Sequence, residues 1–107
     1  MMAFYDVTKQ EIFDQAKKRI AKIFSIPVES LNLKDRFDGE LQASFVSDFK
    51  DNEFDKINYD LQDVADKSMR KKLQSGDVVV NTVEDYCEYM CACFEVNPKG
   101  VYKVLGF

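Results

Sequence analysis

The stretch from Asn52 to Val64 constrains the fold of this chain most, because its apolar residues recur with the period of an α-helix. Four apolar residues spaced three, four and three positions apart predict one buried stripe: Phe54, Ile57, Leu61 and Val64. The rest of its surface carries aspartates at four positions: Asp55, Asp60, Asp63 and Asp66. Such a helix packs on a small bundle and presents carboxylates either to water or to a basic partner.

The composition bounds the size and the partners of the domain. With 107 residues, of which 46% are apolar and 13% aromatic, the chain has the length of one domain and can bury a core without disulfides or metal. Its net charge of -4 and pI near 4.8 argue against sequence-independent binding of nucleic acid, which needs basic patches. The same charge fits a soluble protein with basic protein partners.

Several features that the sequence lacks bear on location and chemistry. No run of about 18 apolar residues occurs, so we expect no membrane span. The N-terminus lacks the basic and apolar segments of a secretory signal. The three cysteines, Cys87, Cys91 and Cys93, are not spaced as a disulfide framework, and we expect a reducing, cytoplasmic compartment. A chain without histidine lacks the commonest general base and the commonest metal ligand, so we expect that this protein is not an enzyme.

A first helix is predicted over residues 9–24. Its apolar positions follow the helical period, and Thr8 and Glu11 have the spacing of a capping box. Pro27 ends it, because the residue before a proline is disfavoured in the α conformation. A long loop follows, anchored by three apolar residues: Leu31, Leu33 and Phe37. Residues 41–49 form either a short helix or an ordered part of this loop.

The second half of the chain predicts a last helix over residues 83–93, capped by Asn81 or Thr82. The central helix either ends at Val64 or continues to Leu73. Residues 78–80 are three valines, which favour a strand.

The C-terminal extension contains NPKG between two β-prone runs, Phe94–Val96 and Val101–Leu105, and this pattern favours a small β-hairpin. The expected fold is therefore mainly α, a three- or four-helix bundle with a long first loop. Its expected parts are a lead-in at 1–8, a helical domain at 9–93 and the extension at 94–107.

This order of elements resembles that of the acyl carrier protein family, and the residues agree with the likeness over roughly 9–90. The first helix and loop of such carriers are similar to EIFDQAKKRIAKIFSIPVESLNLKDRF. The family's last helix typically contains Thr-Val and, after five intervening residues, Tyr-Ile, and here Thr82, Val83, Tyr89 and Met90 stand at those positions. The resemblance implies a helical fold that docks on biosynthetic enzymes through its second helix.

The centre of the chain departs from the family's Asp-Ser-Leu motif, whose serine bears 4'-phosphopantetheine. Counted forward from Phe37, the motif falls near Ser44, without the aspartate. Counted back from Val83, it falls on NEFD, and Glu53 then stands in place of the serine. We favour the second register, because a misplaced helix would bury unpaired aspartates.

Two functions follow from these registers. The favoured one is a non-catalytic protein-interaction module that lacks the attachment serine and binds the basic surface of a protein partner through four carboxylates: Glu53, Asp55, Asp60 and Asp63. The alternative is a working acyl or aminoacyl carrier with phosphopantetheine on Ser44, or on Ser47 as the second candidate. A metal or redox site at the three cysteines is the third, least favoured class. A fourth ligand is absent, and the spacing of the cysteines matches no zinc ribbon.

Overall fold

The computed structural model of the protein describes residues 7–37, 39, 41 and 53–107, and this part of the chain is built from α-helices and one short 3-10 helix. The elements in chain order are α1 (Lys9–Phe24), η1 (Val28–Ser30), α2 (Glu53–Val64), α3 (Lys67–Ser75), α4 (Val83–Val96) and α5 (Pro98–Leu105). The prediction of a mainly α bundle is confirmed. No helix within these ranges combines the length and the apolar character needed to cross a membrane.

The first helix begins and ends where its sequence predicts. The Thr8 hydroxyl accepts a hydrogen bond from the Glu11 amide at 3.1 Å, and the Glu11 carboxylate accepts one from the Thr8 amide at 3.2 Å. This capping box satisfies amides that have no partner inside the helix. At the other end Ser25 adopts a left-handed conformation with φ 57°, which stops the helix before Pro27.

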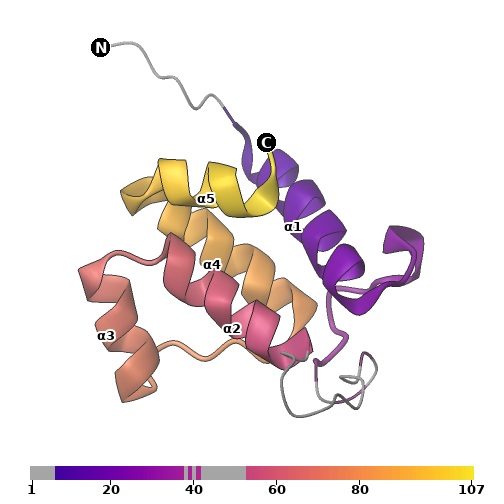
Figure 1. Ribbon diagram of the computed structural model, residues 1–107, viewed down its shortest axis with the longest axis horizontal. Coiled ribbons are helices and arrows are strands. Elements are labelled where there is room, and N and C mark those ends of the chain that lie inside the picture. Colours follow the sequence, from indigo (N-terminus) through magenta and orange to yellow (C-terminus); the bar gives the residue numbers. More distant parts are fainter. Residues whose placement is uncertain (1–6, 38, 40, 42–52) are drawn as a thin grey trace.

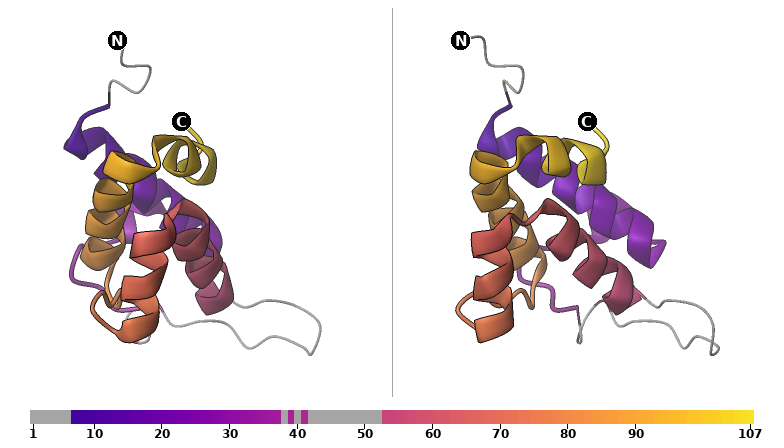
Figure 2. Two further views of the ribbon diagram at one scale, coloured as in Figure 1. Left: turned by 90° about the vertical axis from the view of Figure 1, so that its left-hand side faces the viewer. Right: turned by 60° about the vertical axis from the view of Figure 1, so that its left-hand side comes forward.

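Four helices share the core. Helices α1, α2, α4 and α5 all contact one another, and α5 lies across one end of the bundle (Figures 1 and 2). The largest side chains that are fully buried come from each of them: Tyr86, Ile20, Met90, Val64, Val83, Val101, Cys87 and Cys93. By contrast, α3 buries no residue and only its Met69 and Leu73 touch the core.

The long first loop is tied to the start of α4. The Phe37 amide donates to the carbonyl of Asn81 at 3.0 Å, and the Glu84 amide donates to the carbonyl of Leu33 at 2.8 Å. Leu31 and Phe37 are buried, as expected for anchors of an ordered loop. The only β-bridge among the described residues is the isolated one between Arg36 and Thr82, so the three valines at 78–80 do not form a strand.

The predicted β-hairpin at 94–107 is wrong. Helix α4 continues to Val96, and α5 begins directly afterwards with Pro98 at its first position, where the missing N–H of proline costs nothing. The Asn97 side chain caps α5 by accepting a hydrogen bond from the Gly100 amide. Val101 and Leu105 are buried against the bundle, so this segment is part of the core.

The central helix ends at Val64, and it does not continue to Leu73. Asp66 begins a separate helix, since its carboxylate accepts a hydrogen bond from the Met69 amide at 2.9 Å. The resulting corner turns α3 away from the axis of α2 (Figure 1).

Candidate functional site

An apolar pocket of about 240 Å³ lies beside the first turns of α2. Its lining comes from α2, from the anchored loop and from the segment before α4: Phe37, Phe54, Ile57, Asn58, Leu61, Val80 and Asn81. Phe54 stands at the pocket with 38% of its surface exposed. We call this feature the Phe54 pocket.

Phe37, which forms one wall of the Phe54 pocket, is fixed by contacts with two other aromatic rings. The Phe37 ring stacks on the Phe24 ring with centroids 6.0 Å apart, and it meets the Tyr86 ring edge-on at 6.4 Å. Aromatic contacts of this geometry favour one orientation of each ring. The wall is therefore formed by the core of the bundle itself.

The four carboxylates predicted to form a docking surface do not lie together. Asp55 and Asp63 are exposed and Glu53 is half-buried, while Asp60 is only 3% exposed. Tyr59, half of whose surface is exposed, lies between Asp55 and Asp63 at four-residue spacing on either side. The outer surface of α2 is thus a mixed polar and aromatic one.

Asp60 contradicts the prediction of an exposed docking carboxylate, because it is the centre of a buried network. The Arg19 guanidinium donates to both its oxygens, from Nε to Oδ2 at 2.8 Å and from Nη2 to Oδ1 at 2.9 Å. The Tyr86 hydroxyl also donates to Oδ2 at 2.8 Å. A buried carboxylate without such partners would be strongly destabilising, so the network compensates for the burial and joins α1, α2 and α4.

The proton affinities in this network follow from its geometry. The hydrogen bond to Asp60 raises the pKa of Arg19. Burial raises the pKa of Tyr86 well above its usual value, and the nearby charge of Asp60 raises it further. Tyr86 therefore stays neutral and Arg19 stays charged at any physiological pH, as a structural network requires.

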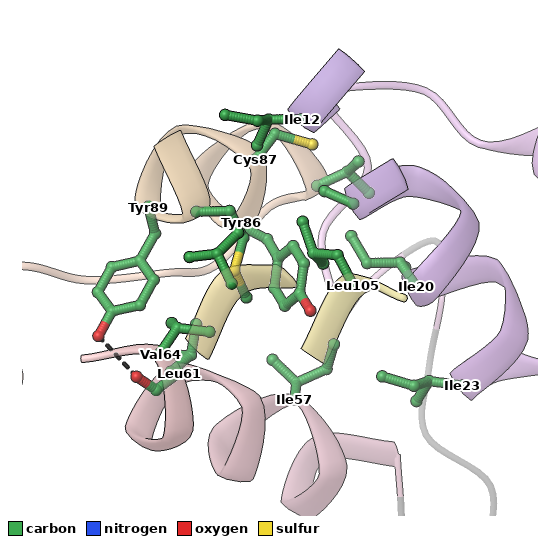
Figure 3. Close-up of a cluster of buried hydrophobic side chains, with 14 of the residues drawn as sticks. Ile12, Ile20, Ile23, Ile57, Leu61, Val64, Tyr86, Cys87, Tyr89 and Leu105 are labelled. Carbon is green, nitrogen blue, oxygen red and sulfur yellow. Dashed lines mark hydrogen bonds between the residues drawn. The ribbon is translucent and has the colours of Figure 1, made fainter. Parts of the chain in front are cut away.

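A second tyrosine fixes the position of α2 against α4. Figure 3 shows Tyr89 extending from α4 to the main chain of α2, where its hydroxyl donates to the carbonyl of Leu61 at 2.7 Å. Tyr86, the other labelled tyrosine of Figure 3, projects from α4 toward the space between α1 and α2. The two tyrosines hold α2 at the Asp60 side chain and at the Leu61 carbonyl.

The attachment serines predicted from the resemblance, Ser44 and Ser47, lie outside the described residues. Glu53 is the first residue of α2. A carboxylate there interacts favourably with the positive end of the helix dipole, so helix stability is sufficient to explain its position.

The cysteines are core residues of α4. Cys87 and Cys93 are buried and Cys91 is partly exposed, and all three are free thiols. Burial raises the pKa of Cys87 to about 12 and that of Cys93 to about 11, which keeps both in the thiol form, whereas metal binding needs the thiolate. Across the described ranges, no three Cys, Asp or Glu side chains are grouped as a metal site.

Comparisons of the chain with protein-family models, with curated proteins and with solved structures find no match. The candidate site therefore rests on the geometry of the Phe54 pocket. The sequence predicted Phe54, Ile57 and Leu61 as parts of one buried stripe; Ile57 and Leu61 are buried, whereas the prediction is wrong for Phe54, which is 38% exposed. The sequence did not indicate the contribution of Val80 and Asn81 to the pocket. Val80 and Asn81 belong to the segment that connects α3 to α4, and no local sequence pattern predicts that this segment lies next to α2.

Proposed function

We propose that this chain is a non-catalytic protein-interaction module with an acyl-carrier-like arrangement of helices, and that its docking surface is the amino-terminal half of α2. The observation that carries the proposal is Phe54, which is 38% exposed beside a preformed apolar pocket. Partly exposed aromatic side chains next to pockets are typical anchors of protein interfaces. An apolar side chain of the partner fills the Phe54 pocket and packs against this ring.

The charge around this anchor selects a basic partner. Both acidic residues in the first turn of α2, Glu53 and Asp55, lie next to Phe54 in the sequence, and the whole chain is acidic. Complementary charge of this kind accelerates encounter and disfavours acidic partners. The expected ligand is therefore an apolar side chain flanked by lysine or arginine.

A non-catalytic role is supported by the state of the nucleophilic groups that the structure describes. The raised pKa values of Tyr86, Cys87 and Cys93 keep these groups protonated, which makes them poor nucleophiles and poor bases. Their hydrogen bonds and burial serve the packing of α4.

A display library of short peptides tests the interaction directly. We expect peptides selected by the full chain to contain an apolar residue next to basic ones, and we expect Phe54→Ala to weaken their binding at least about tenfold. Tyr59→Ala is the matched control, because Tyr59 is exposed on the same helix and does not line the pocket. Equal binding by Phe54→Ala and wild type would refute the proposed docking surface.

The carrier function is the second candidate, and the order of the described helices favours it. A first helix, a long connection, a second helix, a short helix and a capped later helix follow one another as the resemblance implies. Intact mass before and after incubation with coenzyme A and a broad-specificity phosphopantetheinyl transferase distinguishes the two functions. An added arm that is lost in Ser44→Ala identifies a carrier, whereas no change, with a control carrier fully modified, favours the interaction module.

A further inference from the structure

A polar hollow of about 400 Å³ lies between α1, α2, α3 and α5, apart from the Phe54 pocket. Figure 1 shows α5 crossing above α2, with α1 on one side and α3 on the other. The lining is mainly charged: Arg19, Asp60, Asp63, Arg70, Gly100, Lys103 and Val104. A volume of this size is in the range of small-molecule sites, which start at about 300 Å³.

The charges of the hollow do not cancel within the protein. Arg19 and Asp60 neutralise each other in their two-bond ion pair. Of the remaining groups, Arg70 and Lys103 are positive and only Asp63 is negative, which leaves one positive charge in excess although the whole chain carries -4. Neither Lys103 nor Asp63 forms an ion pair within the described ranges. An anion in the hollow would balance this excess positive charge.

Two of the cations are placed by contacts that leave donors for a ligand. The ion pair with Asp60 uses two of the five N–H groups of Arg19, and Asp60, itself buried, fixes the guanidinium at the hollow. The Arg70 guanidinium makes only long hydrogen bonds, of 3.3 and 3.4 Å, to the carbonyl of Gln62. Arg70 also lies near the amino-terminal end of α3, where the helix dipole disfavours a cation.

We propose that this hollow binds a small phosphorylated polyol. The phosphate contacts Arg70, Lys103 and the remaining donors of Arg19, because planar guanidinium groups and ammonium groups are the usual partners of phosphate oxygens. The Asp63 carboxylate accepts hydrogen bonds from the hydroxyl groups. This assignment does not depend on the docking surface of α2.

Titrations of the full chain with three probes test the proposal by backbone amide NMR shifts: glucose 6-phosphate, inorganic phosphate and glucose. We expect glucose 6-phosphate to bind most tightly, with a Kd below about 1 mM at low salt, and to shift amides around Lys103, Gly100 and Asp63. Glucose should cause no shift. The absence of any shift with glucose 6-phosphate at ten times that concentration would overturn the proposal.

Variants of exposed residues separate a specific site from general attraction of anions. We expect Arg70→Gln and Lys103→Gln each to raise the Kd for glucose 6-phosphate at least tenfold. Lys99→Gln is the control, since it removes the same charge from the exposed surface of α5 without touching the hollow. Equal effects of Lys103→Gln and Lys99→Gln would reject a defined site. Helical circular dichroism, unchanged in all three variants, verifies that each one is folded.

The role of Asp63 has its own readout. Asp63→Asn removes a negative charge, so we expect it to tighten binding of inorganic phosphate while reducing the preference for glucose 6-phosphate over phosphate. Weakened binding of both probes would contradict the assignment of Asp63 to the hydroxyl groups. Binding only to vesicles that contain phosphatidic acid, and not to glucose 6-phosphate, would assign the phosphate to a lipid and overturn the proposal of a soluble polyol.

Discussion

Replacing Arg19 by methionine tests how much the Asp60 network stabilises the fold. Methionine keeps an apolar stem of similar length but removes both donors to Asp60. Asp60, 3% exposed, then keeps only the Tyr86 hydroxyl as a partner. The substitution therefore leaves a buried charge largely uncompensated.

The magnitude follows from the burial of the two partners. Removing one member of a buried ion pair costs about 3–5 kcal/mol. The Arg19 side chain is 30% exposed while that of Asp60 is 4% exposed, so water reaches one side of the pair and the lower end, about 3 kcal/mol, applies. That is a large share of the roughly 5–15 kcal/mol by which small domains are stable.

Urea unfolding followed by circular dichroism measures this change. We expect Arg19→Met to lower the transition midpoint by about 1–3 M without changing the slope m. Lys18→Met is the matched control, because Lys18 is exposed on the same helix, and we expect its effect to stay within about 0.5 kcal/mol. A loss below about 0.5 kcal/mol in Arg19→Met would refute the reasoning that Asp60 is a buried charge that depends on its partner.

A combined variant separates the ion pair from packing. Replacing Arg19 by Met, Asp60 by Leu and Tyr86 by Phe removes every polar group of the network, so no unpaired group remains buried. Apolar replacement of a whole buried network is often neutral or stabilising. We expect the triple variant to be more stable than Arg19→Met alone, and a triple variant that is less stable would show that packing, rather than charge, accounts for the loss.

Three further predictions follow from the described contacts. Gly100→Ala should destabilise the fold by about 1–2 kcal/mol in urea unfolding, because its Cβ would lie 2.4 Å from Asn97 Nδ2 and displace the amide that donates to the carbonyl of Val64; a gain in stability would contradict this geometry. In native protein at pH 8, Cys91 should react with a thiol reagent before the buried Cys87, and all thiols should react at once in urea; equal native rates would argue against the burial of Cys87. Stability should fall with rising pH above about 9, because two groups have a higher pKa in the folded state, which therefore binds more protons there than the unfolded state does. These groups are Cys87, whose pKa rises from 9.0 to about 12, and Tyr86. A free energy of unfolding that stays constant from pH 9 to 11 would contradict both shifts.

Helices whose signals are local were predictable from the sequence. The capping box at Thr8 and the apolar period place α1 at Lys9–Phe24, and the stripe that includes Phe54 and Val64 places α2, although the sequence left its end open between Val64 and Leu73. Thr82 begins α4 as one of the two expected caps, through a capping box with Asp85. In each case the contacts that define the helix lie within four residues of one another in the sequence.

The failures depend on contacts between distant residues or on an ambiguous local signal. Asp60 looks like any other aspartate of α2 until Arg19, 41 residues earlier, is placed beside it. The NPKG stretch contains the residues of a turn, but Asn97 followed by Pro98 is also a capped helix start. Burial of Val101 and Leu105 against the bundle favours the helix, and that burial is a tertiary effect.

The joint at Asn97 constrains how this chain can diverge during evolution. One amide side chain donates to the carbonyl of Val64 at 3.1 Å and accepts from the amide of Gly100, so it joins the end of α2 to the start of α5. Aspartate would keep the acceptor but lose the donor, and a side chain at position 100 would collide with the amide. Relatives that retain this joint should therefore keep asparagine and glycine as a covarying pair three residues apart, and should lose both together where α5 is absent.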